Sequence, residues 1–296
     1  MTTELLLSFH VEEHFHAPAF DSPMRRRHWE QCESRVERNT EKILALLAER
    51  NVGATFFVLG WVAERHGGLI RRIASEGHEI ASHGYAHEPV TAQTTKQFRE
   101  DVRKTKRILE ELIGEPVLGY RAPGSSLTKE TGWTLPILVE EGYRYDSSLC
   151  ALPDRSRRHA VCYQLESTGG PLWEIPINCL RMGGLALPTH GFSIRLISYR
   201  LLRRVMKLAE ASHKSVVVNL RVWEVDPSQP RMTGRARALF QQYYNLAILE
   251  HRLRMLVRDF QFGPLREAVQ LEETRRAPSL ALPAALPSGI HITTVP

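Results

Sequence analysis

The sequence predicts an α/β protein built as a closed or nearly closed β/α barrel, and three observations predict it. Short apolar runs rich in β-favouring residues alternate with amphipathic segments of helical periodicity, which is typical of βα units on a mainly parallel sheet. About six or seven such units fit into the 296 residues. Polar clusters follow directly after the apolar runs, at the strand ends where a barrel builds its sites.

The first half of the chain gives the clearest elements. A buried strand ends at Phe9, and a helix is predicted over 36–50 from the apolar spacing of residues 43–47, with Asn39 as its N-cap. "ATFFVLG" (54–60) reads as a buried strand closed by glycine, followed by an amphipathic helix over 61–77 and a short strand over 78–84. The next helix, over 95–112, places Phe98, Val102 and Leu109 on one stripe.

The second half continues the alternation with weaker signals. Further strands are predicted at 116–124, 143–148, 171–177 and 215–225, and further helices near 129–141, 194–212 and 235–257. The tail 275–296 is rich in Ala and Pro without periodicity, so we expect it to be disordered. We therefore expect one domain over 1–270.

Composition narrows the class of protein. The net charge of +6 comes largely from arginine clusters at 25–27, 155–158 and 200–204. These clusters lack interleaved aromatic residues and an accompanying nucleic-acid motif, so we expect a solvated basic surface and no nucleic-acid partner. The four cysteines are widely spaced with no C-x-x-C pair, which fits a reducing compartment. No apolar run suits a membrane span and no signal peptide is evident, so we expect a cytoplasmic protein.

Two polar clusters suggest a metal site. "SHGYAH" carries His83 and His87 four residues apart at a strand end, so a helical turn there would project both imidazoles to one side. "HVEEH" supplies His10 and Glu12, which point the same way along an extended strand, while Glu13 points oppositely unless the chain has turned. A His-His-carboxylate site with open positions is a hydrolytic arrangement, although the histidine pair taken alone is also compatible with ordinary core or surface histidines.

Three further polar clusters are each only weak evidence for a functional site. Arg121 in "GYRAPG" precedes a rigid Pro-Gly turn and could orient a carboxylate, or it could belong to a surface turn. "YDSSL" contributes Asp146. "NLRVWEVDP" contributes Arg221, Trp223 and Glu224.

Taken in order, these clusters resemble the polysaccharide deacetylase (NodB-homology) family over roughly residues 5–270. The resemblance lies in "ATFFVLGWVAERH", "GHEIASHGYAH", "GYRAPG" and "RYDSSL". More narrowly, "VWEVDPSQPRM" and "LRMLVRDFQFGPLREAV" are similar to the extra C-terminal region of deacetylases from exosortase and exopolysaccharide loci, which implies such a region at about 221–270. The resemblance implies a distorted (β/α)7 barrel, a divalent metal such as zinc, and removal of acetyl groups from an N-acetylated glycan.

Carried over by position, the resemblance implies a role for each cluster. Metal ligands would be Glu12, His83 and His87, and His10 would stand at the general-base position that is normally an aspartate. Arg121 would orient that base, Asp146 would support the general acid, and Arg221 would stand where the acid is normally a histidine. The substrate-binding residues implied are Pro123, Trp173, Ile175 and Trp223.

The positions at which this chain departs from the family pattern concern proton transfer. Deacetylation needs a base to activate water and an acid to protonate the leaving amine, and arginine, with a pKa above about 12, can serve only as a fixed cation. His10 could act as the base, or it could become a third imidazole ligand and leave Glu12 or Glu13 as the base. If Asp146 and Arg221 face each other, they would form an ion pair.

Three functions follow from the resemblance and its departures. The first is a metal-dependent deacetylase of an N-acetylated polysaccharide, acting in exopolysaccharide synthesis or modification. The second is a non-catalytic relative that keeps the fold and binds glycan or a partner enzyme. The third is a hydrolase of small cyclic amides, as relatives of the allantoinase type are.

Overall fold

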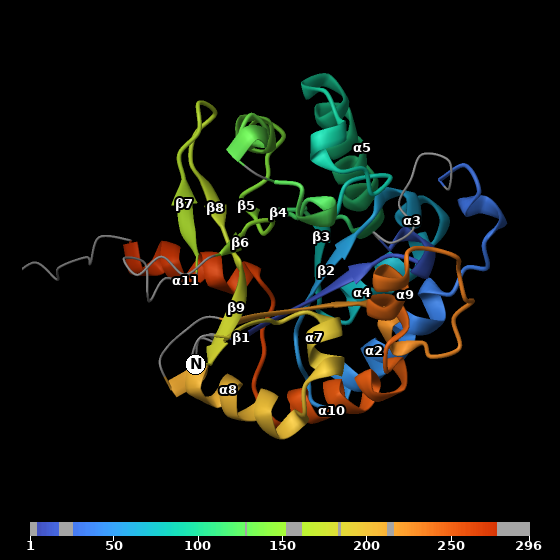
Figure 1. The fold of residues 1–296 in the computed structure, drawn as a ribbon. Coiled ribbons are helices and arrows are strands. Elements are labelled where there is room, and N and C mark those ends of the chain that lie inside the picture. The colour runs from blue at the N-terminus through green and yellow to red at the C-terminus, as the bar shows by residue number, and fades with distance from the viewer. Residues whose placement is uncertain are drawn as a thin grey trace, which may run out of the picture.

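A computed structural model gives the architecture of the chain (Figure 1). It describes residues 5–17, 26–127, 129–151, 162–182, 185–211 and 216–276. The arginines at 155–158 and nearly all of the predicted disordered tail lie outside the described residues. No helix in these ranges is long and apolar enough to cross a bilayer.

One curled sheet organises the molecule, with strand order β11-β1-β2-β3-β4-β5-β8-β7. Every neighbouring pair from β11 to β8 is parallel, and only the edge strand β7 is antiparallel. The predicted distorted seven-stranded β/α barrel is therefore confirmed as a mixed sheet that closes only half-way. The strands are β1 Leu5–Val11, β2 Thr55–Val58, β3 Glu79–Ser82, β4 Gly119–Tyr120, β5 Tyr145–Asp146, β7 Tyr163–Leu165, β8 Leu172–Glu174 and β11 Val216–Arg221.

The helices and a second small sheet cover this curled sheet. The small sheet contains β6 Cys150–Ala151, β9 Ile177–Met182 and β10 Leu185–Pro188. The helices are α2 Val36–Ala48, α3 Gly60–Arg65, α4 Gly67–Ser75, α5 Thr95–Ile113, α6 Thr134–Glu140, α7 Gly191–Leu196, α8 Tyr199–Ala211, α9 Ala236–Tyr243, α10 Leu249–Asp259 and α11 Arg266–Arg276.

Several helix predictions were wrong in their extent. The helices predicted over 61–77, 194–212 and 235–257 are each two helices, broken at His66, near Ile197 and by the turn before Leu249. The helix α11 was not predicted. Asn39 is not an N-cap, because α2 already begins at Val36 and Asn39 is buried within it.

Strict alternation along the strands separates an outer core from the barrel interior. In β1, Leu5, Leu7 and Phe9 belong to the apolar layer under the helices. Leu6 points inward, where it packs with Leu265 and other residues at the start of α11. Because successive side chains alternate between the two faces, Ser8 and His10 also point into the interior, above that apolar floor.

Candidate metal centre

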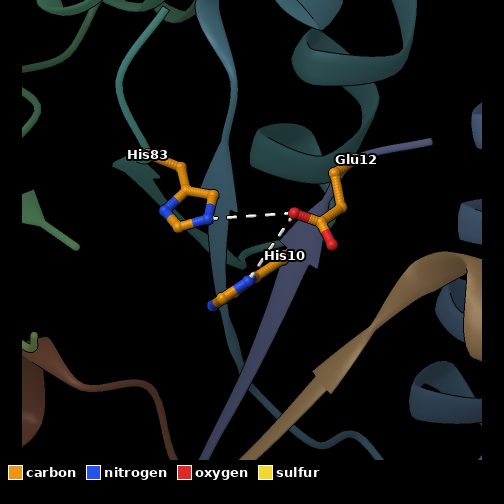
Figure 2. A group of neighbouring side chains, drawn as sticks. All are labelled: His10, Glu12 and His83. Atoms are coloured by element: carbon orange, nitrogen blue, oxygen red, sulfur yellow. Dashed lines mark ion pairs between the residues drawn. The ribbon is translucent and has the colours of Figure 1, made fainter. Parts of the chain in front are cut away.

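His10, Glu12 and His83 bring one ligand atom each to a common point at the carboxyl ends of β1 and β3 (Figure 2). Their ligand atoms lie within 4.8 Å of one another, and all three side chains are buried. Glu12 Oε2 is 3.9 Å from His10 Nδ1 and 3.8 Å from His83 Nε2. The same oxygen is 3.4 Å from His87 Nε2, so the predicted convergence of both histidines of "SHGYAH" on Glu12 is found.

The hydrogen bonds of His83 prepare it as a ligand. Its Nδ1 lies 2.7 Å from the carbonyl oxygen of Arg121, and a carbonyl can only accept, so Nδ1 carries the proton. Burial and neighbouring His87 hold the pKa of His83 well below its usual value, so the ring is neutral and Nε2 keeps its lone pair. This is how a metal-binding histidine is normally oriented by its second nitrogen.

The group leaves polar atoms that only a cation or a proton would satisfy. Glu12 Oε2 and His83 Nε2 are buried and have no hydrogen-bond partner. An electron-rich oxygen facing two imidazole nitrogens at 3.4–3.8 Å without a donor is unfavourable in a protein interior. A divalent metal between them would remove that cost, so these residues fit a metal ion.

The segment that carries His87 is fixed on both sides. Asp101 on α5 accepts hydrogen bonds from the backbone N–H of Tyr85 at 3.0–3.1 Å. The first backbone N–H groups of α3 donate to the carbonyls of Gly84 and Tyr85. Gly84 and His87 both have positive φ, 73° and 51°. A non-glycine residue held in this region is uncommon and concentrates at functional sites.

Arg121 lies beneath the metal group, almost fully buried. Its guanidinium donates to Ser8 Oγ at 2.9 Å, to Asn219 Oδ1 at 2.8 Å and to Ser147 at 2.7–2.8 Å. It also lies 3.2 Å from His10 Nε2. Arg121 therefore contacts His10, and its role in orienting His10 stays a prediction.

The contact with Arg121 fixes what His10 can do. A guanidinium only donates, so the 3.2 Å contact is a hydrogen bond only if His10 Nε2 is unprotonated. Burial, with nearby His83 and Arg121, lowers the pKa of His10 well below its usual value, so the ring is neutral and its proton sits on Nδ1. Acceptance from Arg121 and coordination of a metal through Nδ1 are therefore alternatives for this ring.

Glu13 does not reach the metal group. Its carboxylate accepts hydrogen bonds from Ser34 Oγ at 2.5 Å, from Arg35 N at 2.9 Å and from Val36 N at 3.1 Å. It therefore caps the first turn of α2, a role that sequence reasoning assigned to Asn39. Both carboxylate oxygens face this helix start, and this geometry does not support Glu13 as a general base.

Arg221 and Trp223 both contact Glu12. Arg221 Nε lies 3.0 Å from Glu12 Oε1, and Trp223 Nε1 donates to the same oxygen at 3.1 Å. The ion pair with Arg221 and the hydrogen bond from Trp223 both engage Oε1, and Oε2 faces the histidines. Trp223, expected to bind substrate, thus contacts a candidate ligand directly.

Asp146 does not face Arg221, contrary to the ion pair that we considered. It stands in register with Tyr120 and Glu174 on the outer face of the sheet. Its carboxylate accepts from Ser148 Oγ at 2.6 Å and is hydrogen-bonded to Glu174. Burial raises the pKa of Asp146, and burial beside Asp146 raises that of Glu174 well above its usual value, which favours the protonated form of Glu174.

The other expected substrate residues lie in two places. Pro123 follows β4 and lies beside Gly84, close to the metal group. Ile175 is fully buried in the interior cluster. Trp173 belongs to the same cluster and lines a hollow of about 350 Å³ with Arg144 and Glu273. That hollow lies towards α11, so the structure does not bring Trp173 to the metal group.

The supporting residues Ser8, Asn219 and Ser147 were not predicted. A signal for two of them was present, because Ser8 and Asn219 interrupt apolar strands two residues before His10 and Arg221. Period-two counting from the site residues would have placed both on the interior face.

Comparison with known proteins identifies the family. Residues 21–145 match the family model described as polysaccharide deacetylase. This segment of the chain is therefore a polysaccharide deacetylase domain. Residues 145–270 match a second model, a domain of unknown function named DUF3473. The curled sheet takes strands from both matched segments, while β1 lies before the first.

Relatives match over short segments. The chain is 39% identical over 95 residues to a peptidoglycan-N-acetylglucosamine deacetylase of Bacillus cereus, covering 32% of this chain and 34% of that protein. It is 40% identical over 70 residues to a chitooligosaccharide deacetylase of Rhizobium leguminosarum, covering 24% and 33%. The matches thus span about a third of these relatives' lengths.

Solved structures share the fold over nearly the whole chain. A Mycobacterium smegmatis protein assigned to the polysaccharide deacetylases superposes with a TM-score of 0.60 at 23% identity, covering 93% of this chain and 92% of that one. An allantoinase superposes with a TM-score of 0.58 at 18% identity, covering 92% of each. At these identities the likeness concerns the fold alone.

Proposed function

We propose that this protein is a metal-dependent hydrolase that removes N-acetyl groups from a glycan, with zinc as its metal. One observation carries the proposal: buried, unpartnered ligand atoms of Glu12 and His83 converge, with His87 Nε2 at 3.4 Å from the same carboxylate oxygen. The names of the relatives, a peptidoglycan-N-acetylglucosamine deacetylase and a chitooligosaccharide deacetylase, support the substrate class.

Glu12, His83 and His87 would hold the ion, and His10 is the alternative third imidazole. A bound divalent metal would polarise the acetyl carbonyl and lower the pKa of water at the site. The protein's own contribution is orientation: Arg121 fixes His10, and the Arg121 carbonyl fixes His83. With its proton on Nδ1, His10 would donate a hydrogen bond towards the reacting groups.

Proton transfer to the leaving amine has no obvious donor at Arg221. Its guanidinium cannot give up a proton, and its contact with Glu12 makes it a fixed positive charge beside the reaction centre. It would stabilise negative charge that develops on the carbonyl oxygen. Activity of the parent chain is therefore expected to lie below that of an enzyme with both an acid and a base, each worth about 10²–10⁴ in rate.

The second candidate is a non-catalytic glycan-binding protein of the same fold. The Arg221–Glu12 contact and the orientation of Asp146 away from Arg221 favour it, because together they leave the general-acid position without a proton donor. A hydrolase of small cyclic amides gains no support, since the likeness to an allantoinase concerns the fold alone.

Acetate release from N-acetylglucosamine oligomers by the zinc-loaded protein tests the proposal. We expect activity that chelation removes and that the double variant His83→Ala/His87→Ala lacks. Activity that survives this double substitution refutes the metal mechanism. If the parent is inactive but His10→Asp/Arg221→His gains activity, the second candidate holds; a parallel screen of cyclic amides tests the third.

A further inference from the structure

An aromatic cluster projects from α7 and α9 in the C-terminal half of the chain. The rings of Phe192 and Phe240 are 5.9 Å apart, those of Phe240 and Tyr244 4.8 Å, and those of Phe192 and Tyr244 6.3 Å. Phe240 is 52% exposed, and the other two are partly exposed. None of the three belongs to a hydrophobic core cluster of the described residues. We call these three residues the aromatic platform.

The platform is linked to the candidate metal centre by contacts through Glu224 and Arg221. His190 forms a parallel bridge with Asn219 of β11, so α7 starts at the carboxyl end of the sheet, where the metal ligands are. The backbone of Gly191 presses against Glu224, because a Cβ there would lie 2.0 Å from Glu224 Oε2. That same oxygen accepts from the backbone N–H of Arg221, whose side chain contacts Glu12. Phe192 therefore directly follows Gly191, which contacts Glu224 at the edge of the site.

A buried ion pair holds the platform rigid. Arg195 and Glu224 are each 1% exposed and pair at 2.9 Å. Arg195 also donates to the backbone carbonyls of Gln241 and Tyr244, which tie α7 to the end of α9. Its guanidinium lies 5.8 Å from the centre of the Phe192 ring. One side chain therefore joins both helices of the platform to the turn that follows Arg221.

We propose that the aromatic platform is a sugar-binding subsite that stacks a pyranose unit of the glycan at some remove from the acetyl group being removed. A pyranose has an apolar C–H face with polar edges, and rigid aromatic rings bind such a face at low entropic cost. Exposed aromatic surface next to a functional cleft commonly marks a binding site. His190, 6.5 Å from the Phe192 ring, adds a polar edge.

The inference rests on the proposed function for its substrate class and commits to a polymer rather than a single sugar. The ligand must reach from the metal group, past Arg221, to the platform. Binding affinity should therefore increase with the length of the glycan. A single N-acetylglucosamine placed at the metal group should not contact the platform.

Binding of the N-acetylglucosamine hexamer and monomer to the zinc-loaded full chain, measured by calorimetry, tests the inference. We expect Phe240→Leu and Tyr244→Ala each to weaken hexamer binding about three- to tenfold. Phe240→Trp should retain affinity, because it keeps the flat π face that leucine lacks. Leu208→Ala is the matched control, since Leu208 is 56% exposed on α8, and it should leave hexamer binding unchanged.

The inference is overturned if the parent does not bind the hexamer, if Phe240→Leu and Tyr244→Ala both bind it like the parent, or if leucine serves as well as tryptophan. It is also overturned if sedimentation shows that the platform residues hold two copies of the chain together while hexamer affinity is unaffected. Failure of the proposed function looks different: zinc-dependent acetate release would be missing, whatever the hexamer affinity of the variants.

Discussion

The adjacent carboxylates Glu12 and Glu13 can be tested against each other, because they contact different groups in the structure. Glu12 faces three histidines, whereas Glu13 accepts hydrogen bonds from Ser34 and from the first backbone N–H groups of α2. Replacing each by alanine should therefore produce two different losses. One variant should lose metal binding and the other should lose folding stability.

The magnitudes follow from these contacts. Glu13→Ala removes a helix cap worth roughly 0.5–2 kcal/mol and leaves the backbone N–H groups of Arg35 and Val36 without an acceptor, so we expect a loss of about 2–3 kcal/mol. For a chain of this size that lowers Tm by about 5 °C. Zinc at a concentration of about 100 times its Kd should raise the stability of the parent by about 2.7 kcal/mol, and Glu12→Ala should lose this increment.

Thermal unfolding of parent and variants, with zinc and with a chelator, is the assay. Glu13→Ala should melt lower than the parent under both conditions by the same amount and keep its response to zinc. Glu12→Ala should show no response to zinc. If Glu13→Ala loses the zinc response, or if Glu12→Ala keeps it, the assignment of the two carboxylates is incorrect.

Three further predictions concern residues around the site. Arg221→Ala should strengthen zinc binding about tenfold in a titration with a competing chelator, because a guanidinium 3.0 Å from Glu12 opposes a second cation; unchanged or weaker binding would contradict this. Burial raises the pKa of Asp101 from 3.8 to about 6. Between these two pH values the folded chain therefore holds a proton on Asp101 that the unfolded chain lacks. As the pH falls through 6, this proton increases the stability of the folded chain. Urea unfolding with chelator at pH 4.5 and 6.5 should show the parent gaining about 2 kcal/mol relative to Asp101→Asn on acidification, and a difference that does not change with pH would exclude this role. Gly191→Ala should destabilise the fold by about 1–3 kcal/mol in urea, because its Cβ would lie 2.0 Å from Glu224, whereas Gly68→Ala, with open space around it, should be neutral or slightly stabilising; equal effects would contradict the tight contact.

The strands of the first half were predictable because their signal is local. An apolar run such as Phe56–Phe57 flanked by amphipathic segments has one low-energy arrangement, a strand buried between helices. Weak helix breaks were not predictable. The ends of α3 and α7 depend on how the chain turns at His66 and Ile197, where residues with ordinary propensities adopt non-helical backbone angles.

The sequence by itself determined the alternating β/α architecture and the set of side chains able to form a metal site, because period and residue type are local properties. It also located His83 and His87 beside an acidic strand end, although residues 83–87 form no helical turn. Only the tertiary structure decided which groups the carboxylates of Glu12 and Glu13 contact. Glu12 turns to the histidines and Glu13 to α2 because the chain bends after β1, and Asp146 faces away from Arg221 because strand register assigns it to the outer face of the sheet. A one-residue difference in register or turn reverses the direction of a side chain, and that difference is set by packing between segments far apart in the chain.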